Sequence, residues 1–125
     1  MRDALAKTGR PIFYSICNWG EDDTMQWGAA TGNSWRTTMD IKDYWASMEY
    51  NFFESQKFAH VAGPGGWNDP DMLEVGNGGM TEDEEKTHFA LWAIAKAPLI
   101  IGCDLTTVKK SSLDILMNES LIAVN

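Results

Sequence analysis

Cysteine is scarce in this sequence, which has two, Cys17 and Cys103, among 125 residues. Two cysteines so far apart do not make a disulfide framework, and no CxxC spacing offers the thiolate pairs of structural zinc sites or redox enzymes. We therefore predict that both are free thiols, packed as small hydrophobic side chains.

Basic residues are outnumbered by acids, 10 to 18, which gives a formal net charge of -8. The acids are spread over residues 21–23, 69–74 and 82–85 and do not form a single tail. Such a surface repels a polyanion, and no stripe of lysine and arginine with interleaved aromatics offers an electrostatic footprint. Nucleic acid is therefore excluded as a partner, whereas a neutral sugar carries no such penalty.

Long hydrophobic runs are missing too. No stretch approaches the ~20 apolar residues of a membrane helix, and residues 1–5 lack the apolar region of a signal peptide, so nothing points to a membrane. The sequence is nevertheless 44% hydrophobic, enough for a packed core. We predict one domain over residues 1–125. The sequon Asn118-Glu119-Ser120 is compatible with secretion but leaves the compartment open.

Four short stretches have the composition of β-strands bounded by turn residues. They are residues 12–17, 34–38, 66–68 and 99–103. The last, Leu99-Ile100-Ile101-Gly102-Cys103, is an unbroken apolar run, typical of a strand buried on both faces of a parallel sheet. Residues 20–32 contain several glycines and are predicted to be a loop.

Helical patterns lie between these strands. Apolar residues at helical spacing predict a helix over residues 41–55, with a core stripe of Ile41, Tyr44, Trp45, Met48 and Phe52. A capping box at residues 81–84 opens a second helix, which ends at Ala97 before Pro98. Weaker patterns predict helix over residues 1–7 and 106–117, with a further element beginning at residues 121–124.

Alternating buried strands and amphipathic helices predict an α/β fold with a right-handed parallel sheet. An open doubly wound sheet and part of a barrel both satisfy that pattern. After the first strand, however, stands Cys17-Asn18-Trp19-Gly20 instead of a glycine-rich phosphate-binding motif. This favours a barrel, although the chain has about half of the ~250 residues that an eight-stranded barrel needs.

Polar residues follow the predicted strands, where a βα barrel carries its active site. They are Asn18, Arg36, Asp40, Asp69, Asp71 and Asp104. Nearby Trp19, Trp35 and Trp67 offer rings that can stack on a sugar, which favours a carbohydrate site. Structural roles stay open: Arg36 can be a surface side chain, Asp40 a helix cap, and Asp69 and Asp71 can bind loop amides.

Metal binding competes as an interpretation of Asp69, Asp71 and Glu74, because hard cations bind clustered carboxylate oxygens. The segment lacks the spacing of a calcium-binding hand, and His60 and His88 are isolated, so no zinc pair is indicated. We predict neither a metal nor an organic cofactor.

Three segments are more specific: YSICNWG at residues 14–20, NSWRTTMDI at 33–41 and AGPGGWNDPDMLEVGN at 62–77. They resemble α-galactosidases of glycoside hydrolase family 27, the melibiases, and the similarity continues almost to residue 125. The resemblance implies a partial (β/α)8 TIM barrel, corresponding to strands five to eight with their helices. It also implies hydrolysis of terminal α-D-galactose with retained configuration, from a galactose-containing oligosaccharide or glycoconjugate.

The same resemblance assigns roles to residues. Asp40, which closes the WRxxxD motif, corresponds to the catalytic acid/base, and Arg36 lines its pocket. Asp71 and Met72 match positions that border the galactose ring, whereas Asp69 is structural. Asn18 stands where many relatives carry a glutamate for the 2-hydroxyl, and its neighbour Trp19 is a further candidate for substrate binding.

A retaining enzyme needs a second carboxylate ~5 to 5.5 Å from the first. In the family it belongs to a K-[YF]-D motif, which these 125 residues do not contain. We therefore expect the chain to carry the acid/base half of the site, to be a fragment of the parent barrel and to be inactive alone. A non-catalytic galactose-binding remnant is the alternative from another class.

Three further expectations concern specificity and environment. Glu21 and Asp22 make no enlarged pocket for an acetamido group, which favours galactose and leaves α-N-acetylgalactosaminidase as an alternative. Animal relatives pair the cysteine at Cys17 with one just before the WR motif, where Gly32 and Asn33 stand here, so that disulfide is absent. Family members are usually secreted, lysosomal or vacuolar, and uncovered barrel edges predict self-association.

Overall fold

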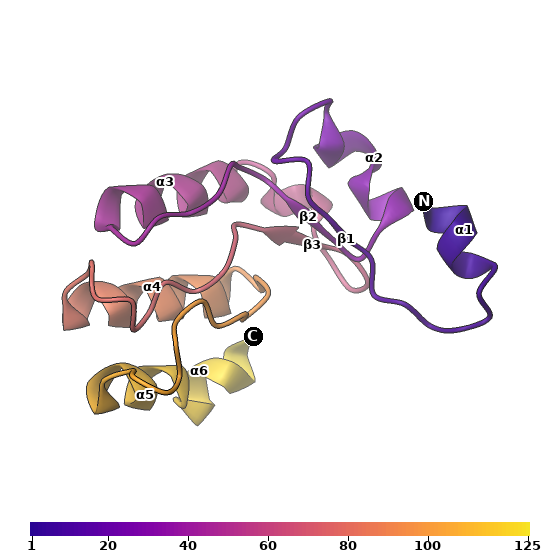
Figure 1. Cartoon of the computed structure of the whole chain (residues 1–125). Helices are drawn as coiled ribbons and strands as arrows, with labels where there is room; N and C mark the ends of the chain where they lie inside the picture. The colour runs from indigo at the N-terminus through magenta and orange to yellow at the C-terminus, as the bar shows by residue number, and fades with distance from the viewer.

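The computed structural model describes residues 1–125 as helices alternating with a small parallel sheet (Figure 1). The strands are β1 (Ser15–Ile16), β2 (Ser34–Arg36) and β3 (Trp67–Asp69). The α-helices are α1 (Arg2–Ala6), α2 (Thr24–Thr31), α3 (Trp45–Gln56), α4 (Glu82–Ile94), α5 (Lys110–Leu116) and α6 (Glu119–Val124), and a 3-10 turn, η1, covers Ala59–Val61.

The strands lie side by side in chain order, β1-β2-β3, and both pairs are parallel. Ser15 pairs with Ser34, and Ser34 pairs with Trp67, so the three strands end at the same edge of the sheet. Helices connect consecutive strands, and Figure 1 shows α3, α4 and α5 lying next to one another on one side of the sheet. This is the βα repeat of a barrel that is only partly closed.

A fourth strand position follows in the same direction, but it is reduced to one bridge, Leu73 with Ile101. The Leu73 amide donates to the Ile100 carbonyl at 2.8 Å, and the Gly102 amide donates to the Leu73 carbonyl at 2.9 Å. The prediction of burial on both faces is wrong in this chain, since Ile100 is 52% and Ile101 41% exposed. No element of the chain covers these two side chains.

The predicted loop at residues 20–32 is wrong, because its second half forms α2. The glycines of this stretch lower its helix propensity, which is why the sequence predicted a loop. Gly28, however, allows α2 to lie close against the sheet. A Cβ atom there would come within 2.9 Å of the Trp35 ring. Close packing on a fully buried tryptophan therefore outweighs the local preference.

The other elements agree in kind and differ at their ends. The first strand is shorter than residues 12–17, and α3 begins at Trp45 instead of residue 41, which leaves Tyr44 50% exposed and outside the core. The Thr81 capping box is confirmed, with both reciprocal hydrogen bonds formed. A turn in which Asp104 accepts from Thr106 delays α5, which is shorter than predicted.

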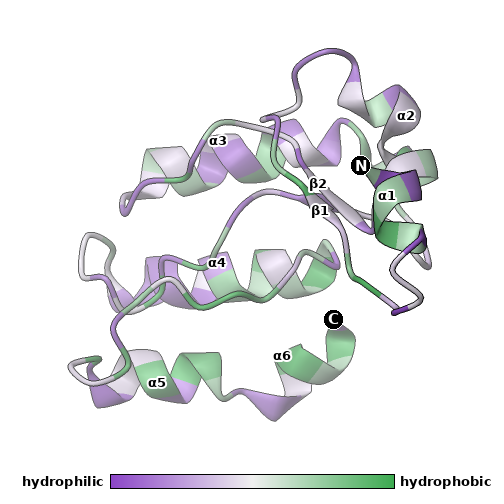
Figure 2. Cartoon of the chain, turned by 45° about the vertical axis from the view of Figure 1, so that its right-hand side comes forward, coloured by the Kyte–Doolittle hydropathy of each residue, from purple (hydrophilic) through white to green (hydrophobic).

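The hydrophobic core lies between the sheet-end segment at residues 73–80 and the helices. It consists of Ile41, Met48, Leu73, Val75, Met80, Phe89, Trp92, Ala97, Ile115 and Leu116. Figure 2 shows the hydrophilic beginning of α4 and the hydrophobic residues of α5 and α6. The core thus holds α3, α4 and α5 together and leaves the strand ends free to carry polar groups.

Candidate active site

A hollow of about 440 Å³ opens at the carboxyl ends of the strands. Its lining comes from β1, β2, β3 and the segments that follow them: Ser15, Cys17, Arg36, Asp40, Ile41, Asp69, Asp71, Met72, Glu74 and Ile100. Four carboxylates and one guanidinium therefore meet at the edge where βα barrels place their active sites.

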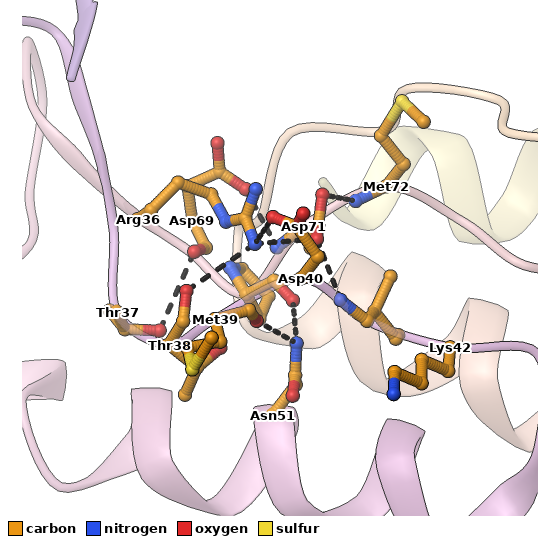
Figure 3. A network of polar contacts seen from close by, with 12 residues as sticks. Arg36, Thr37, Thr38, Met39, Asp40, Lys42, Asn51, Asp69, Asp71 and Met72 are labelled. Atoms are coloured by element: carbon orange, nitrogen blue, oxygen red, sulfur yellow. Dashed lines mark hydrogen bonds and ion pairs between the residues drawn. The ribbon is translucent and has the colours of Figure 1, made fainter. Parts of the chain in front are cut away.

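Arg36 lines this hollow and lies at the centre of its network of polar contacts (Figure 3). Its Nη2 lies 2.5 Å from Asp71 Oδ2 and 3.1 Å from Asp40 Oδ1, and it also donates to the Thr38 carbonyl at 3.3 Å. The arginine side chain is 9% exposed, so it is not the ordinary surface residue that the sequence left open. It joins a carboxylate from the β2 end to one from the β3 end.

Asp71 is fixed from every side. Its Oδ2 accepts from the Ile41 amide and its Oδ1 from the Met72 amide, both at 2.8 Å, while its own amide donates to Asp69 Oδ1 at 2.8 Å. Its backbone has φ +91°, which is unfavourable for a residue with a side chain and persists only where surrounding bonds impose it. Asp71 therefore ties Arg36 to the peptide that follows Asp40.

Asp40 is much more exposed than its neighbours in this network. Its side chain is 72% exposed, against 10% for that of Asp71. The interpretation of Asp40 as a helix cap is wrong, because α3 begins at Trp45 with Tyr44 as its N-cap residue. One oxygen of Asp40 contacts Arg36, and the carboxylate otherwise faces the hollow and solvent.

Asn51 supports both loops from below. Its side-chain amide donates to the Met39 carbonyl at 3.3 Å and to the Pro70 carbonyl at 3.0 Å. Because Asn51 is a buried residue of α3, the helix fixes the distance between the segment that carries Asp40 and the segment that carries Asp71.

Helix α4 holds the Asp71 segment from the opposite side. Trp92 Nε1 donates to the Asp71 carbonyl at 2.7 Å, and His88 Nε2 accepts from the Glu74 amide at 3.0 Å. Both side chains are completely buried, and their rings meet edge to face at 4.1 Å. Neither ring lines the hollow.

Burial shapes the protonation of this region. It raises the pKa of Asp69, although the Asp71 amide and Arg36 oppose the rise, and it raises the pKa of Glu74. Burial also lowers the pKa of His88 to about 4, so the imidazole is neutral at pH 7 and free to accept a hydrogen bond. The acids that the structure keeps from water therefore lie beside Asp40, not at it.

Sequence reasoning placed some residues in the hollow that the structure puts elsewhere. The Asn18 amide donates to the Glu21 carbonyl and to Thr24 Oγ1, so it anchors the start of α2. Trp19 is 41% exposed and does not line the hollow. Trp35 is fully buried and cannot stack on a sugar; its Nε1 donates to Asn68 Oδ1.

The remaining predicted features are placed as follows. Arg36, Asp40, Asp71 and Met72 come together, and Asp69 serves as an acceptor for the Asp71 amide, in line with an Asx turn. Both cysteines are free thiols, but the prediction that both are packed is wrong for Cys17, which is exposed, whereas Cys103 is half-buried. No group of three potential metal-ligating side chains is found, and no helix is long and apolar enough to span a membrane.

Three residues that organise the site were missed by the sequence reasoning: Asn51, His88 and Trp92. Each is a polar or polar-tipped residue on the buried side of a helix, where burial without a partner is costly. Such residues within an apolar stripe were a usable signal, since they demand a hydrogen-bond partner in the neighbouring segment.

A second hollow, of about 310 Å³, lies at the opposite ends of the strands and is lined by Arg2, Arg10 and Tyr14 among others. That edge of a βα barrel usually serves stability, so the acidic hollow is the stronger candidate. Parallel βα units with converging carboxylates and one buried arginine at the strand ends are the arrangement in which βα-barrel enzymes carry their active sites.

Comparisons with known proteins identify the family. The family model described as Melibiase_2, Alpha galactosidase A, matches residues 1–125. Over the whole chain the sequence is 59% identical to alpha-galactosidase 3 of Arabidopsis thaliana and 53% identical to an alpha-galactosidase of rice, Oryza sativa. The chain covers 29% and 30% of these relatives.

Solved structures agree. An α-galactosidase of Saccharomyces cerevisiae with raffinose superposes with a TM-score of 0.97 at 42% identity, covering 99% of this chain and 32% of that one. The chain belongs to the melibiase family of α-galactosidases, and its fold is part of that family's TIM barrel. It spans about a third of the length of the relatives that it matches.

Proposed function

We propose that this chain supplies the proton-donating side of an α-galactosidase site, which hydrolyses terminal α-D-galactose from oligosaccharides or glycoconjugates with retained configuration. One observation carries the proposal within the family: Arg36 contacts both Asp40 and Asp71 in one hollow at the strand ends. The hydrolysis of galactosides is what the relatives' names describe. The residue roles come from the family motifs that residues 33–41 and 62–77 resemble, and the geometry of the hollow supports them.

Asp40 is the proposed acid/base. In a retaining hydrolase one carboxylic acid protonates the departing oxygen and then, as a carboxylate, activates the water that releases the sugar. Asp40 suits this exchange because only one of its oxygens is engaged, at 3.1 Å from Arg36, and its carboxylate is open to the hollow. Asp71 does not suit it, since both of its oxygens already accept backbone amides.

Arg36, Asp71 and Met72 are the proposed binding residues. Arg36 pairs more closely with Asp71 than with Asp40, so its charge is largely compensated without locking the proton donor. Met72 is 40% exposed and offers an apolar edge to the sugar ring. Asn18 and Trp19 do not line the hollow. They are included among the proposed binding residues only because they follow Cys17, which does line it.

The attacking carboxylate is the missing part of the mechanism. The K-[YF]-D motif that carries it in the family does not occur in these 125 residues. We therefore propose that the chain alone binds galactose weakly and has no turnover, and that a carboxylate placed ~5 to 5.5 Å from Asp40 is needed for activity.

The test combines turnover and binding in the purified 125-residue chain. No release of nitrophenol from 4-nitrophenyl α-galactoside is expected, whereas galactose should shift the NMR signals of Arg36, Asp71 and Met72. Glucose is the control sugar, and N-acetylgalactosamine tests the alternative specificity. Turnover that is lost in Asp40→Asn would contradict the inactivity of the chain, and the absence of galactose-dependent shifts would contradict the binding roles.

A further inference from the structure

Helix α4 contributes no side chain to the hollow, yet two of its buried residues hold the segment that does. Trp92 donates to the carbonyl of Asp71 at 2.7 Å, and His88, one turn earlier, accepts from the amide of Glu74 at 3.0 Å. Between these points the Leu73 backbone bonds Ile100 and Gly102. The segment at residues 71–74 is thus held at its two ends and its middle.

The contact with His88 differs from the others because it depends on a side-chain acceptor. An imidazole accepts at Nε2 only when that nitrogen carries no proton. The ring is completely buried and stands edge-on against Trp92, with 89° between the ring planes, so packing fixes the direction in which Nε2 points. A rigid acceptor aimed at one amide can set the position of the backbone that follows.

We propose that His88 is a positioning residue of the active site, which holds residues 71–74 so that Asp71 meets Arg36 and the Ile41 amide. The link runs from the Glu74 amide through the backbone of Leu73 and Met72 to Asp71, whose φ of +91° must be maintained by its surroundings. Its effect on the sugar rests on the proposed function, whereas its effect on the Asp71–Arg36 pair does not.

Substitutions at His88 separate positioning from general stability. His88→Ala removes the acceptor, and His88→Gln restores one, because the glutamine side-chain oxygen reaches about as far as Nε2. Phe89→Leu is the matched control: Phe89 is the adjacent buried residue of α4, 1% exposed, and belongs to the hydrophobic core without bonding the segment. Its loss of packing weakens the core that Phe89 shares with Leu73 and Val75, but it removes no hydrogen bond to the segment.

NMR on the 125-residue chain gives the decisive readouts. Wild type should show a scalar coupling across the hydrogen bond between the Glu74 amide nitrogen and His88 Nε2. In His88→Ala the signals of Asp71 and the Arg36 guanidinium should move, and galactose should bind about tenfold more weakly. His88→Gln should bring the signals back, and Phe89→Leu should leave them and the binding within about twofold of wild type.

Two results would overturn the positioning role: wild-type Asp71 and Arg36 signals in His88→Ala, or equal displacement of them in Phe89→Leu. Absence of galactose binding by the wild-type chain would contradict the proposed function instead. In that case the Asp71 and Arg36 signals still decide whether His88 positions the ion pair.

Discussion

Two regions of this molecule differ in which kind of side chain they bury. In the strand-end network, formed by residues 34–41 and 67–74, three charged residues are buried: Arg36, Asp69 and Asp71 are each at most 9% exposed, whereas Asp40 is open to solvent. In the C-terminal segment, residues 99–125, apolar side chains are exposed, with Ile101 at 41%, Leu105 at 56% and Met117 at 64%. The first region buries charged groups, and the second exposes apolar side chains.

The difference shows where buried charges find partners within the chain, although Arg36 Nε is buried without a hydrogen-bond partner. Burying a charge is tolerable only when a partner and hydrogen bonds compensate it, and the network provides both from within these residues. Exposed apolar groups, by contrast, cost little locally but offer surface for association. The network should therefore be sensitive to single substitutions, and the exposed apolar positions of the C-terminal segment should tolerate them.

The largest effect is expected from Asp71→Ala. It leaves Arg36 buried without its closest partner and the Ile41 amide without an acceptor, which should lower the free energy of unfolding by about 3 to 5 kcal/mol. Urea denaturation at pH 7 measures this. The matched control in the C-terminal segment is Asp114→Ala, which removes an exposed ion pair with Lys110 and should cost less than about 1 kcal/mol.

Asp71→Asn refines the same comparison. Asparagine keeps an acceptor and tolerates a positive φ, so its cost should lie between those of Asp71→Ala and Asp114→Ala. Equal losses for Asp71→Ala and Asp114→Ala would contradict the view that the network holds the strand ends together.

His88 predicts a pH dependence of stability. Its pKa in the folded chain is about 4, below the ordinary 6.5, so between these values the unfolded chain binds a proton that the folded chain does not. Stability should therefore fall as the pH drops from 6.5 to 4, by about 3 kcal/mol in total, and this slope should be absent in His88→Gln.

The exposed histidine provides the control for that experiment. His60→Gln should leave the slope unchanged, because it removes a histidine outside the core. The raised pKa values of Asp69 and Glu74 act in both wild type and variant, so the difference between their unfolding curves isolates His88. A His88→Gln curve that parallels wild type from pH 6.5 to 4 would be inconsistent with a buried neutral imidazole.

A smaller loss is expected from Trp92→Phe, which deprives the Asp71 carbonyl of its buried donor. The free energy of unfolding should fall by about 1 to 3 kcal/mol. Trp27→Phe removes a comparable hydrogen bond, from Nε1 to the Asp22 carbonyl, but at a position 36% exposed, where water can replace it. Equal losses in thermal or urea unfolding would show that burial of the Trp92 bond is unimportant.

The same contrast explains what the sequence could predict. Features with local causes were predicted correctly: the Thr81 capping box and the alternation of strands and helices along the chain. The family followed from three dense segments of residues 14–77. These features depend on neighbours in the chain, so residue type and spacing are enough.

Features that depend on distant partners could not be read in that way. The formation of α2 depends on the close packing of Gly28 against the distant Trp35 ring. The exposure of Ile100 and Ile101 depends on whether another segment covers them. The Asn18 side chain donates to Thr24 and does not face the hollow. The spacing of residues in the sequence does not reveal which hydrogen-bond partner such a side chain takes. Arg36 contacts carboxylates that follow two different strands, Asp40 after β2 and Asp71 after β3. This contact could be found only once the register between the strands was known.

The smallest effect on folding should come from the C-terminal segment. Ile101→Ser with Leu105→Ser replaces exposed side chains and should change the free energy of unfolding by less than about 0.5 kcal/mol per site. Ile115→Ser, at a position 7% exposed in the same segment, should cost more than about 2 kcal/mol, because it empties part of the core. Sedimentation velocity should show less self-association in the double variant at unchanged stability, since exposed apolar area promotes association without supporting the fold. If the double variant unfolded as readily as Ile115→Ser, the two side chains would have to be packed in solution, and the contrast between the two regions would not hold.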